Sequence, residues 1–107
     1  MAEILFTPGA IEDLREIKEY ITEDLCNEAA ALRVVKKITN HIRRLEDFPE
    51  IGTPLSNVMD VEAPYRFLVC GNYTAFYKTE ENSVVIVRIL YGRRNYMQVL
   101  FGKPQDE

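Results

Sequence analysis

Arginine and tyrosine side chains are concentrated in one short segment, residues 89–96, with the sequence ILYGRRNY. Arg93 and Arg94 follow a glycine and stand between Tyr91 and Tyr96. Guanidinium groups bind phosphates and carboxylates through paired hydrogen bonds, and tyrosine rings stack on bases or fill pockets of a partner protein. This chemistry fits a nucleic-acid site, a protein-binding surface, or a strand end that ion pairs anchor.

Two interpretations of these side chains stay open. In the structural one, Arg88 and Arg94 pair with carboxylates of an N-terminal helix, such as Glu12 or Glu16, and anchor the end of a strand. In the functional one, a basic and aromatic surface meets a target or an antagonist protein. The members of that surface are Arg88, Tyr91, Arg93, Arg94 and Tyr96.

The composition limits the class of protein. With 107 residues and 47% apolar side chains, the chain is long enough for one globular domain, and we expect a core over about residues 3–101 and a tail at 102–107. No unbroken apolar stretch exceeds four residues, and the N-terminus lacks a basic region followed by a long apolar one. We therefore expect no membrane span, no secretory signal and a cytoplasmic location.

Metal-ligating residues are scarce and the charge is uneven. Cys26, Cys70 and His41 are too few and too scattered to form a metal site, so we predict no metal and no cofactor. The net charge of −4 argues against a protein that coats nucleic acid. Residues 1–63 carry 7 Lys/Arg and 13 Asp/Glu, whereas residues 64–107 carry 6 and 4. The second half is thus mildly basic.

Two helices are predicted in the N-terminal half. After a short apolar strand at residues 3–6, Thr7 and Pro8 are a typical N-cap and first helical residue. Asn27 begins a second helix, which ends near Phe48–Pro49 because the residue before a proline disfavours the helical conformation. The apolar stripe of the first helix is Ile11, Leu14, Ile17, Ile21 and Leu25. That of the second is Ala31, Val34 or Val35, Ile38, Ile42 and Leu45. The short link predicts an antiparallel hairpin.

The second half of the chain changes to strand-type alternation. We expect a surface loop at residues 50–64 and then strands at 65–70, 73–78 and 84–91. Gly71–Asn72 and a turn at residues 80–83 join the strands as hairpins. The last strand is the most apolar, so we expect it to be central or covered on both faces. Strict alternation would put Val85, Val87, Ile89 and Tyr91 on one face and Val84, Ile86, Arg88 and Leu90 on the other.

This order of elements predicts an α+β fold. An N-terminal strand and a helical hairpin pack on a small antiparallel β-sheet, with the first strand along one edge. Tyr73 and Tyr77 share a strand face and are explained equally well as core residues or as contacts. Because the helices can cover only one sheet face, the apolar residues of the other predict an exposed surface for a partner or for a homodimer.

Several short motifs, in this order and spacing, resemble the RelE/ParE superfamily of toxins from type II toxin-antitoxin modules. They are the Phe48–Pro54 junction, the Tyr65–Arg66 opening, the strand from Tyr73 to Tyr77, and the ending from Val87 to Tyr96. The resemblance covers residues 3 to about 100. It implies a small growth-arresting protein, which a cognate antitoxin neutralises and which binds operator DNA only through the antitoxin complex.

Members of this superfamily act by one of two mechanisms, and few residues of this chain match the first of them. Ribonucleases similar to RelE cleave mRNA on the ribosome with lysines, arginines and a tyrosine. Here the two lysine positions match Arg66 and Leu68, the first arginine falls on Thr74, and the tyrosine falls near Leu100. Only Arg94 matches outright, with Tyr96 as a substitute for the tyrosine. Arg66 keeps a charge but makes a poor base, because its guanidinium stays protonated.

The resemblance is therefore closer to ParE-like members, which imply inhibition of DNA gyrase without enzymatic activity. The first alternative is a ribosome-dependent mRNA interferase that uses Arg66, Arg94 and Tyr96 as catalytic residues. The second is a non-toxic relative that only binds an antitoxin. The expected partners are an antitoxin and either gyrase or the ribosome with its mRNA.

Overall fold

The computed structural model describes residues 1–57, 64–92 and 100. Its helices are α1 (Pro8–Glu19) and α2 (Glu28–Arg43), with a π-helical turn at Tyr20–Asp24 and 3₁₀ turns at Arg44–Glu46 and Leu55–Asn57. Its strands are β1 (Glu3–Phe6), β2 (Thr53–Pro54), β3 (Tyr65–Cys70), β4 (Tyr73–Glu80) and β5 (Ser83–Tyr91). The tail predicted at residues 102–107 lies outside the described residues.

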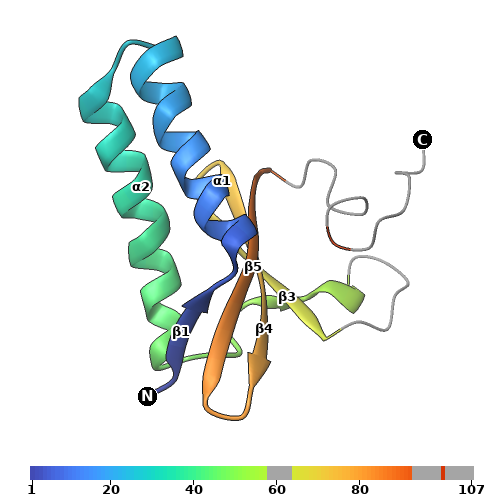
Figure 1. The fold of residues 1–107 in the computed structure, drawn as a ribbon. Helices are drawn as coiled ribbons and strands as arrows, with labels where there is room; N and C mark the ends of the chain where they lie inside the picture. Colours follow the sequence, from blue (N-terminus) through green and yellow to red (C-terminus); the bar gives the residue numbers. More distant parts are fainter. Residues whose placement is uncertain (58–63, 93–99, 101–107) are drawn as a thin grey trace, which may run out of the picture.

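The strands form one sheet in the order β1-β5-β4-β3-β2. Strands β2 to β5 pair antiparallel, whereas β1 pairs parallel to β5. Figure 1 shows both helices on one side of this sheet. The α+β prediction is confirmed, including the edge position of β1, although the sequence did not indicate its direction. β5 lies between β1 and β4, so it is an interior strand, but the middle position belongs to β4.

Both predicted helix starts are confirmed. The side chain of Thr7 accepts a hydrogen bond from the Ala10 amide at 3.1 Å, and the side chain of Asn27 accepts one from the Ala30 amide at 3.0 Å. The Thr7 hydroxyl also donates to the carbonyl of Val87 at 2.7 Å. One threonine thus caps α1 and fixes the start of that helix against β5.

The predicted apolar stripe of the first helix is confirmed in its middle, where Leu14 and Ile17 pack against the core, but is wrong at its two ends. Ala10 and Asp13 are buried, and Ile21 in the following π-helical turn is 6% exposed. Ile11 and Leu25, both predicted to be buried, are 57% and 56% exposed. The prediction was wrong here because it counted only apolar residues, whereas the stripe contains a carboxylate with partners of its own.

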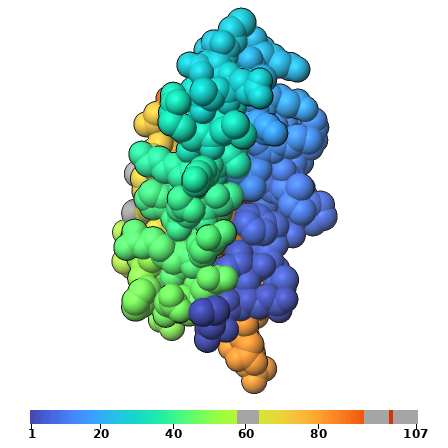
Figure 2. All heavy atoms as spheres, turned by 90° about the vertical axis from the view of Figure 1, so that its left-hand side faces the viewer, coloured from blue at the N-terminus to red at the C-terminus, as the bar shows by residue number. Residues whose placement is uncertain are grey.

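The main core lies between the helices and one sheet face. The α2 stripe is confirmed, since Ala31, Ile38, Ile42 and Leu45 are all buried. Ile38, Ile42 and Leu45 belong to the same cluster as Tyr77 and Ile86 of the sheet, which are fully buried. Figure 2 views the molecule from the helical side, where the two helices lie side by side and the β4–β5 turn protrudes below them.

The opposite sheet face is partly covered by the chain itself. Leu55, Phe67 and Phe76 form a second buried cluster, against which Leu90 and Leu100 pack. Leu55 comes from the segment predicted as an unstructured surface loop, which instead contains β2 and a 3₁₀ turn. The apolar face that was predicted to be exposed for a partner is therefore partly covered by the chain itself, although Val69 remains 58% exposed.

A bulge in β5 changes the direction of its side chains. Tyr77 pairs with Ile86 and Phe76 pairs with Arg88, so Val87 is an extra residue in the register. Val84 and Ile86 are buried before the bulge and Ile89 after it. The predicted strict alternation was wrong beyond Ile86, because one inserted residue exchanges the two faces.

No helix within the described ranges is long and apolar enough to span a bilayer.

Candidate functional site

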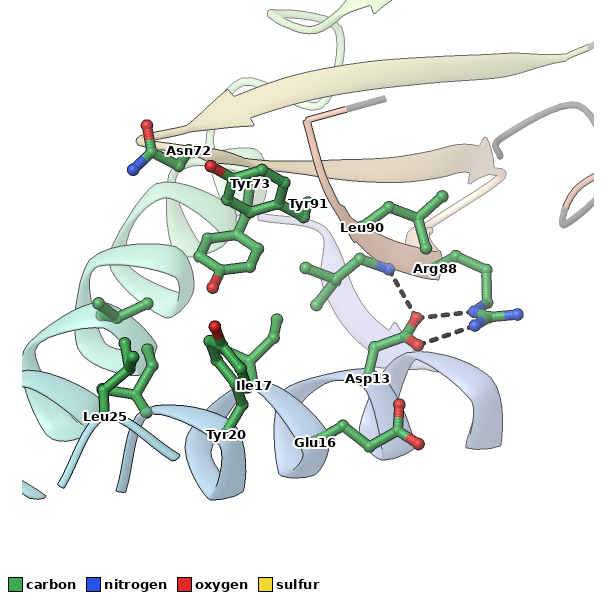
Figure 3. Close-up of a pocket in the computed structure, with 13 residues that line it drawn as sticks. Asp13, Glu16, Ile17, Tyr20, Leu25, Asn72, Tyr73, Arg88, Leu90 and Tyr91 are labelled. Atoms are coloured by element: carbon green, nitrogen blue, oxygen red, sulfur yellow. Dashed lines mark hydrogen bonds and ion pairs between the residues drawn. The ribbon is translucent and has the colours of Figure 1, made fainter. Parts of the chain in front are cut away.

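An open groove of about 870 Å³ lies between the second half of α1, the turn that follows it, and the end of β5. One end is charged and is formed by Asp13, Glu16 and Arg88. The other end is aromatic and is formed by Tyr20, Tyr73 and Tyr91. Figure 3 shows these side chains around the groove.

The charged end is organised by Asp13. Its carboxylate accepts hydrogen bonds from Arg88 Nε at 2.7 Å and Arg88 Nη2 at 2.8 Å, and from the amide of Ile89 at 2.9 Å. The hydrogen bond to Asp13 is the main cause that raises the pKa of Arg88. Asp13 is only 6% exposed and the Arg88 side chain is 32% exposed, so this is a partly buried ion pair with a third, backbone donor.

Local structure brings Arg88 to α1. Strand β1 ends at Phe6, opposite Ile86. Beyond Ile86, β5 still pairs with β4 on one side, and on the other side α1 is its neighbour in place of β1. The Arg88 side chain passes over Gly9, where an added Cβ would lie 3.0 Å from Arg88 Cδ. Glycine at this position leaves room for the arginine to reach Asp13.

The aromatic end brings three tyrosines together. The rings of Tyr73 and Tyr91 pack edge to face with centroids 5.5 Å apart. Figure 3 shows the hydroxyls of Tyr20 and Tyr73 pointing toward each other. Burial, followed by the nearby Tyr91 and Tyr20, raises the pKa of Tyr73. The Tyr73 hydroxyl therefore stays protonated at neutral pH and can donate a hydrogen bond.

Arg66 lies away from the groove, on β3. Its guanidinium donates to the carbonyl oxygens of Gly52 at 2.9 Å and Glu50 at 3.3 Å, and lies 3.5 Å from the Glu50 carboxylate. The hydroxyl of Tyr77 holds the same junction, because it donates to the carbonyl of Pro49 at 3.0 Å and accepts from the Gly52 amide at 2.9 Å. Arg66 thus fastens the Phe48–Pro54 junction to the sheet.

The family model described as the ParE toxin of the type II toxin-antitoxin system parDE matches residues 4–96. The chain belongs to the ParE toxin family. A solved structure titled as a chromosomal ParDE toxin-antitoxin system from P. aeruginosa has the same fold, with a TM-score of 0.71 at 22% identity. The match covers 85% of this chain and 96% of the other. No curated protein matches the chain.

The structure brings together only some of the residues that the sequence singled out in this ParE family member. Arg88 and Tyr91 both line the groove, whereas Arg66 does not. Arg93, Arg94 and Tyr96 lie outside the described residues. Their roles stay predictions.

Arg88 pairs with a carboxylate of the first helix, as the structural interpretation predicted, but that carboxylate is neither Glu12 nor Glu16. Asp13 forms the pair, while the exposed Glu12 pairs with Arg15. Sequence reasoning also missed Tyr20 as a member of the site. One signal for Asp13 was available, because it lies three residues after Ala10 and four before Ile17, within the buried stripe.

Proposed function

We propose that this ParE family toxin arrests growth by inhibiting DNA gyrase and that a cognate antitoxin neutralises it. The observation that carries the proposal is the match to the ParE toxin model over residues 4–96. We further propose that it acts in the cytoplasm and contacts operator DNA only through the antitoxin complex.

In this chain, the positions that carry cations in ribonucleases similar to RelE are either engaged or uncharged. This supports gyrase over mRNA as the target. Arg66 is engaged with the backbone of the Phe48–Pro54 junction. Leu68 packs against the main core, and Thr74 is only 3% exposed. A strand surface arranged in this way offers few cations that could stabilise the negative charge on a phosphate group during its transfer from one oxygen to another.

The proposed target surface consists of the exposed Tyr91 together with Arg93, Arg94 and Tyr96, the last three on sequence grounds alone. Arg88 has a different role in this proposal, because its guanidinium is occupied by Asp13. It fixes the end of β5, from which the surface continues.

Supercoiling of relaxed plasmid DNA by purified gyrase tests the proposal. The wild-type chain should inhibit the reaction and trap cleaved DNA that detergent releases, and Arg94→Ala with Tyr96→Ala should lose this activity while Leu32→Ala, on the outer face of α2, keeps it. Growth arrest with intact gyrase activity and cut transcripts would instead indicate the mRNA interferase. Expression without growth arrest would indicate the non-toxic relative.

A further inference from the structure

We propose that α2 binds the phosphate backbone of double-stranded DNA through a basic face on its solvent side, without reading the base sequence. This inference goes beyond the proposed function, because it rests on one helix and does not depend on the effect of the chain on gyrase. Such a contact is weak by itself. It would add to the affinity for DNA of a complex that already holds the chain beside a duplex.

The cations of α2 are separated from the acidic residues of the chain. Residues 29–45 contain five of the 13 Lys/Arg and none of the 17 Asp/Glu. All five cationic side chains are exposed, and Figure 2 shows α2 on the outside of the molecule. The basic face of α2 consists of Arg33, Lys36, Lys37, Arg43 and Arg44. A chain that is acidic as a whole thus has one helix that attracts anions.

Helical spacing arranges these cations in two rows. Lys36 and Arg43 are seven residues apart, so they lie one above the other along the helix, and Lys37 and Arg44 form a second row beside them. Arg33 lies one turn before both rows. At 1.5 Å per residue the basic face is about 16 Å long. The buried stripe of α2 is on the opposite side of the helix, so packing against the core leaves the basic face open.

Carboxylates of the chain do not neutralise this face. Among the residues that the structure describes, none of the five cations takes part in a salt bridge. The neighbouring helix α1 differs, because its Arg15 pairs with both Glu12 and Glu19. The exposed charges of α1 are therefore balanced within the helix, whereas those of α2 lack a partner of opposite sign within the described ranges.

The stability of the helix does not account for the cluster. Arg33 and Lys37 are four residues apart, and like charges at this spacing destabilise a helix. The helix dipole favours cations only in the last turn, so it explains Arg43 but neither Arg33 nor the two lysines. A polyanion bound along the face would replace this repulsion with attraction.

The shape and composition of the face favour a DNA duplex. The side chains between the two rows are those of Ala29 and Asn40, which offer neither an aromatic ring for stacked bases nor an apolar anchor for a peptide. A helix with its side chains is about 10 Å wide, and the major groove of B-DNA is about 12 Å wide, so two rows of cations can reach phosphates of both strands. The major groove of duplex RNA is too narrow for this.

Fluorescence anisotropy with a labelled DNA duplex of about 20 base pairs tests the proposal on the purified full chain. The wild type should bind in low salt, and its affinity should fall steeply as salt rises. Three to five phosphate contacts correspond to a slope of about −2.7 to −4.5 in a plot of log affinity against log salt concentration.

Two double variants locate the contact. Lys36→Gln with Arg43→Gln removes one row, and should weaken binding about tenfold or more and make the slope shallower by about 2. Lys18→Gln with Lys78→Gln removes the same net charge from α1 and β4, and should change the affinity less than about twofold. Circular dichroism checks that both variants keep the fold.

Two other polyanions separate DNA from the alternative occupants. A duplex RNA and a polyglutamate of equal charge should each bind at least about fivefold more weakly than the DNA duplex. Binding of either as tightly as DNA would overturn the proposal, and so would absence of DNA binding in low salt. Unchanged DNA binding by Lys36→Gln with Arg43→Gln would also overturn it, because other cations would then make the contact. A chain that fails to inhibit gyrase but binds DNA through α2 would leave this inference intact.

Discussion

Arg88 on β5 and Arg66 on β3 both connect a strand to a neighbouring segment, but their partners differ in burial. Arg88 binds a carboxylate that is 6% exposed and that also accepts the Ile89 amide. Arg66 binds two backbone carbonyls and a carboxylate whose side chain is 77% exposed. Two arginines that look equally functional in the sequence therefore contribute differently to the stability of the fold. We expect the arginine with the buried partner to contribute more.

Asp13→Ala should give the largest loss of stability. It leaves the half-buried Arg88 guanidinium and the Ile89 amide without their acceptor, and should lower the free energy of unfolding by about 3 kcal/mol. Urea denaturation followed by circular dichroism measures this. Asp13→Asn, which keeps an acceptor for Ile89, should lose less.

Glu12→Ala is the matched control, because Glu12 lies next to Asp13 on α1 and forms an exposed pair with Arg15. Its unfolding curve should be close to that of the wild type, because solvent screens an exposed pair. Equal effects of Asp13→Ala and Glu12→Ala would show that burial of the carboxylate does not distinguish the two ion pairs.

Gly52→Ala should be next in size, and it tests what holds the junction around Arg66. An added Cβ would lie 2.6 Å from Tyr77 Cε1 and 2.8 Å from the Phe67 carbonyl oxygen, so backbone or ring must move. We expect a loss of about 2 kcal/mol in the same unfolding measurement. The adjacent exposed Thr53→Ala should be nearly neutral, and similar behaviour of both variants would contradict a tight junction.

Cys70 is buried without an ion partner, and we expect it to make the stability of the chain depend on pH. Burial raises the pKa of its thiol from 9.0 to about 11. The folded chain then keeps a proton that the unfolded chain loses above pH 9, so the stability is fully present below pH 9 and falls as pH rises. The loss between pH 8 and 10 should be about 1.4 kcal/mol.

Cys70→Ala should remove most of this pH dependence, and Cys26→Ala, at an exposed thiol, should leave it. Tyr73 and Tyr77, whose pKa values are also raised by burial, add a loss of stability in the same direction as pH approaches their ordinary value of 10, so the thiol dominates the difference between the profiles from pH 8 to 9. Stability profiles of wild type and Cys70→Ala that run parallel from pH 8 to 10 would argue against the thiol as the cause.

The sequence predicted the order of elements because caps, turns and apolar periods are local signals. Thr7, Asn27 and Gly71–Asn72 each act within a few residues, and all three predictions are confirmed. The errors concern contacts between distant segments. Nothing near Val87 indicates a bulge, and nothing near Asp13 indicates which distant residue takes up its charge, an arginine 75 residues later. A polar residue within an apolar helical stripe was the one local sign of that contact.

Apart from the control variants, Arg66→Ala should have the smallest effect, and it separates fold from function. Arg66 is 25% exposed and its carboxylate partner is 3.5 Å away, so its loss should lower the free energy of unfolding by less than about 1 kcal/mol, since Tyr77 still holds the junction. Because the proposed gyrase inhibitor does not use this side chain, growth arrest and gyrase inhibition should persist in the variant. If Arg66→Ala instead abolished growth arrest while keeping the wild-type unfolding curve, Arg66 would contact the target, and the ribosome would replace gyrase in the proposal.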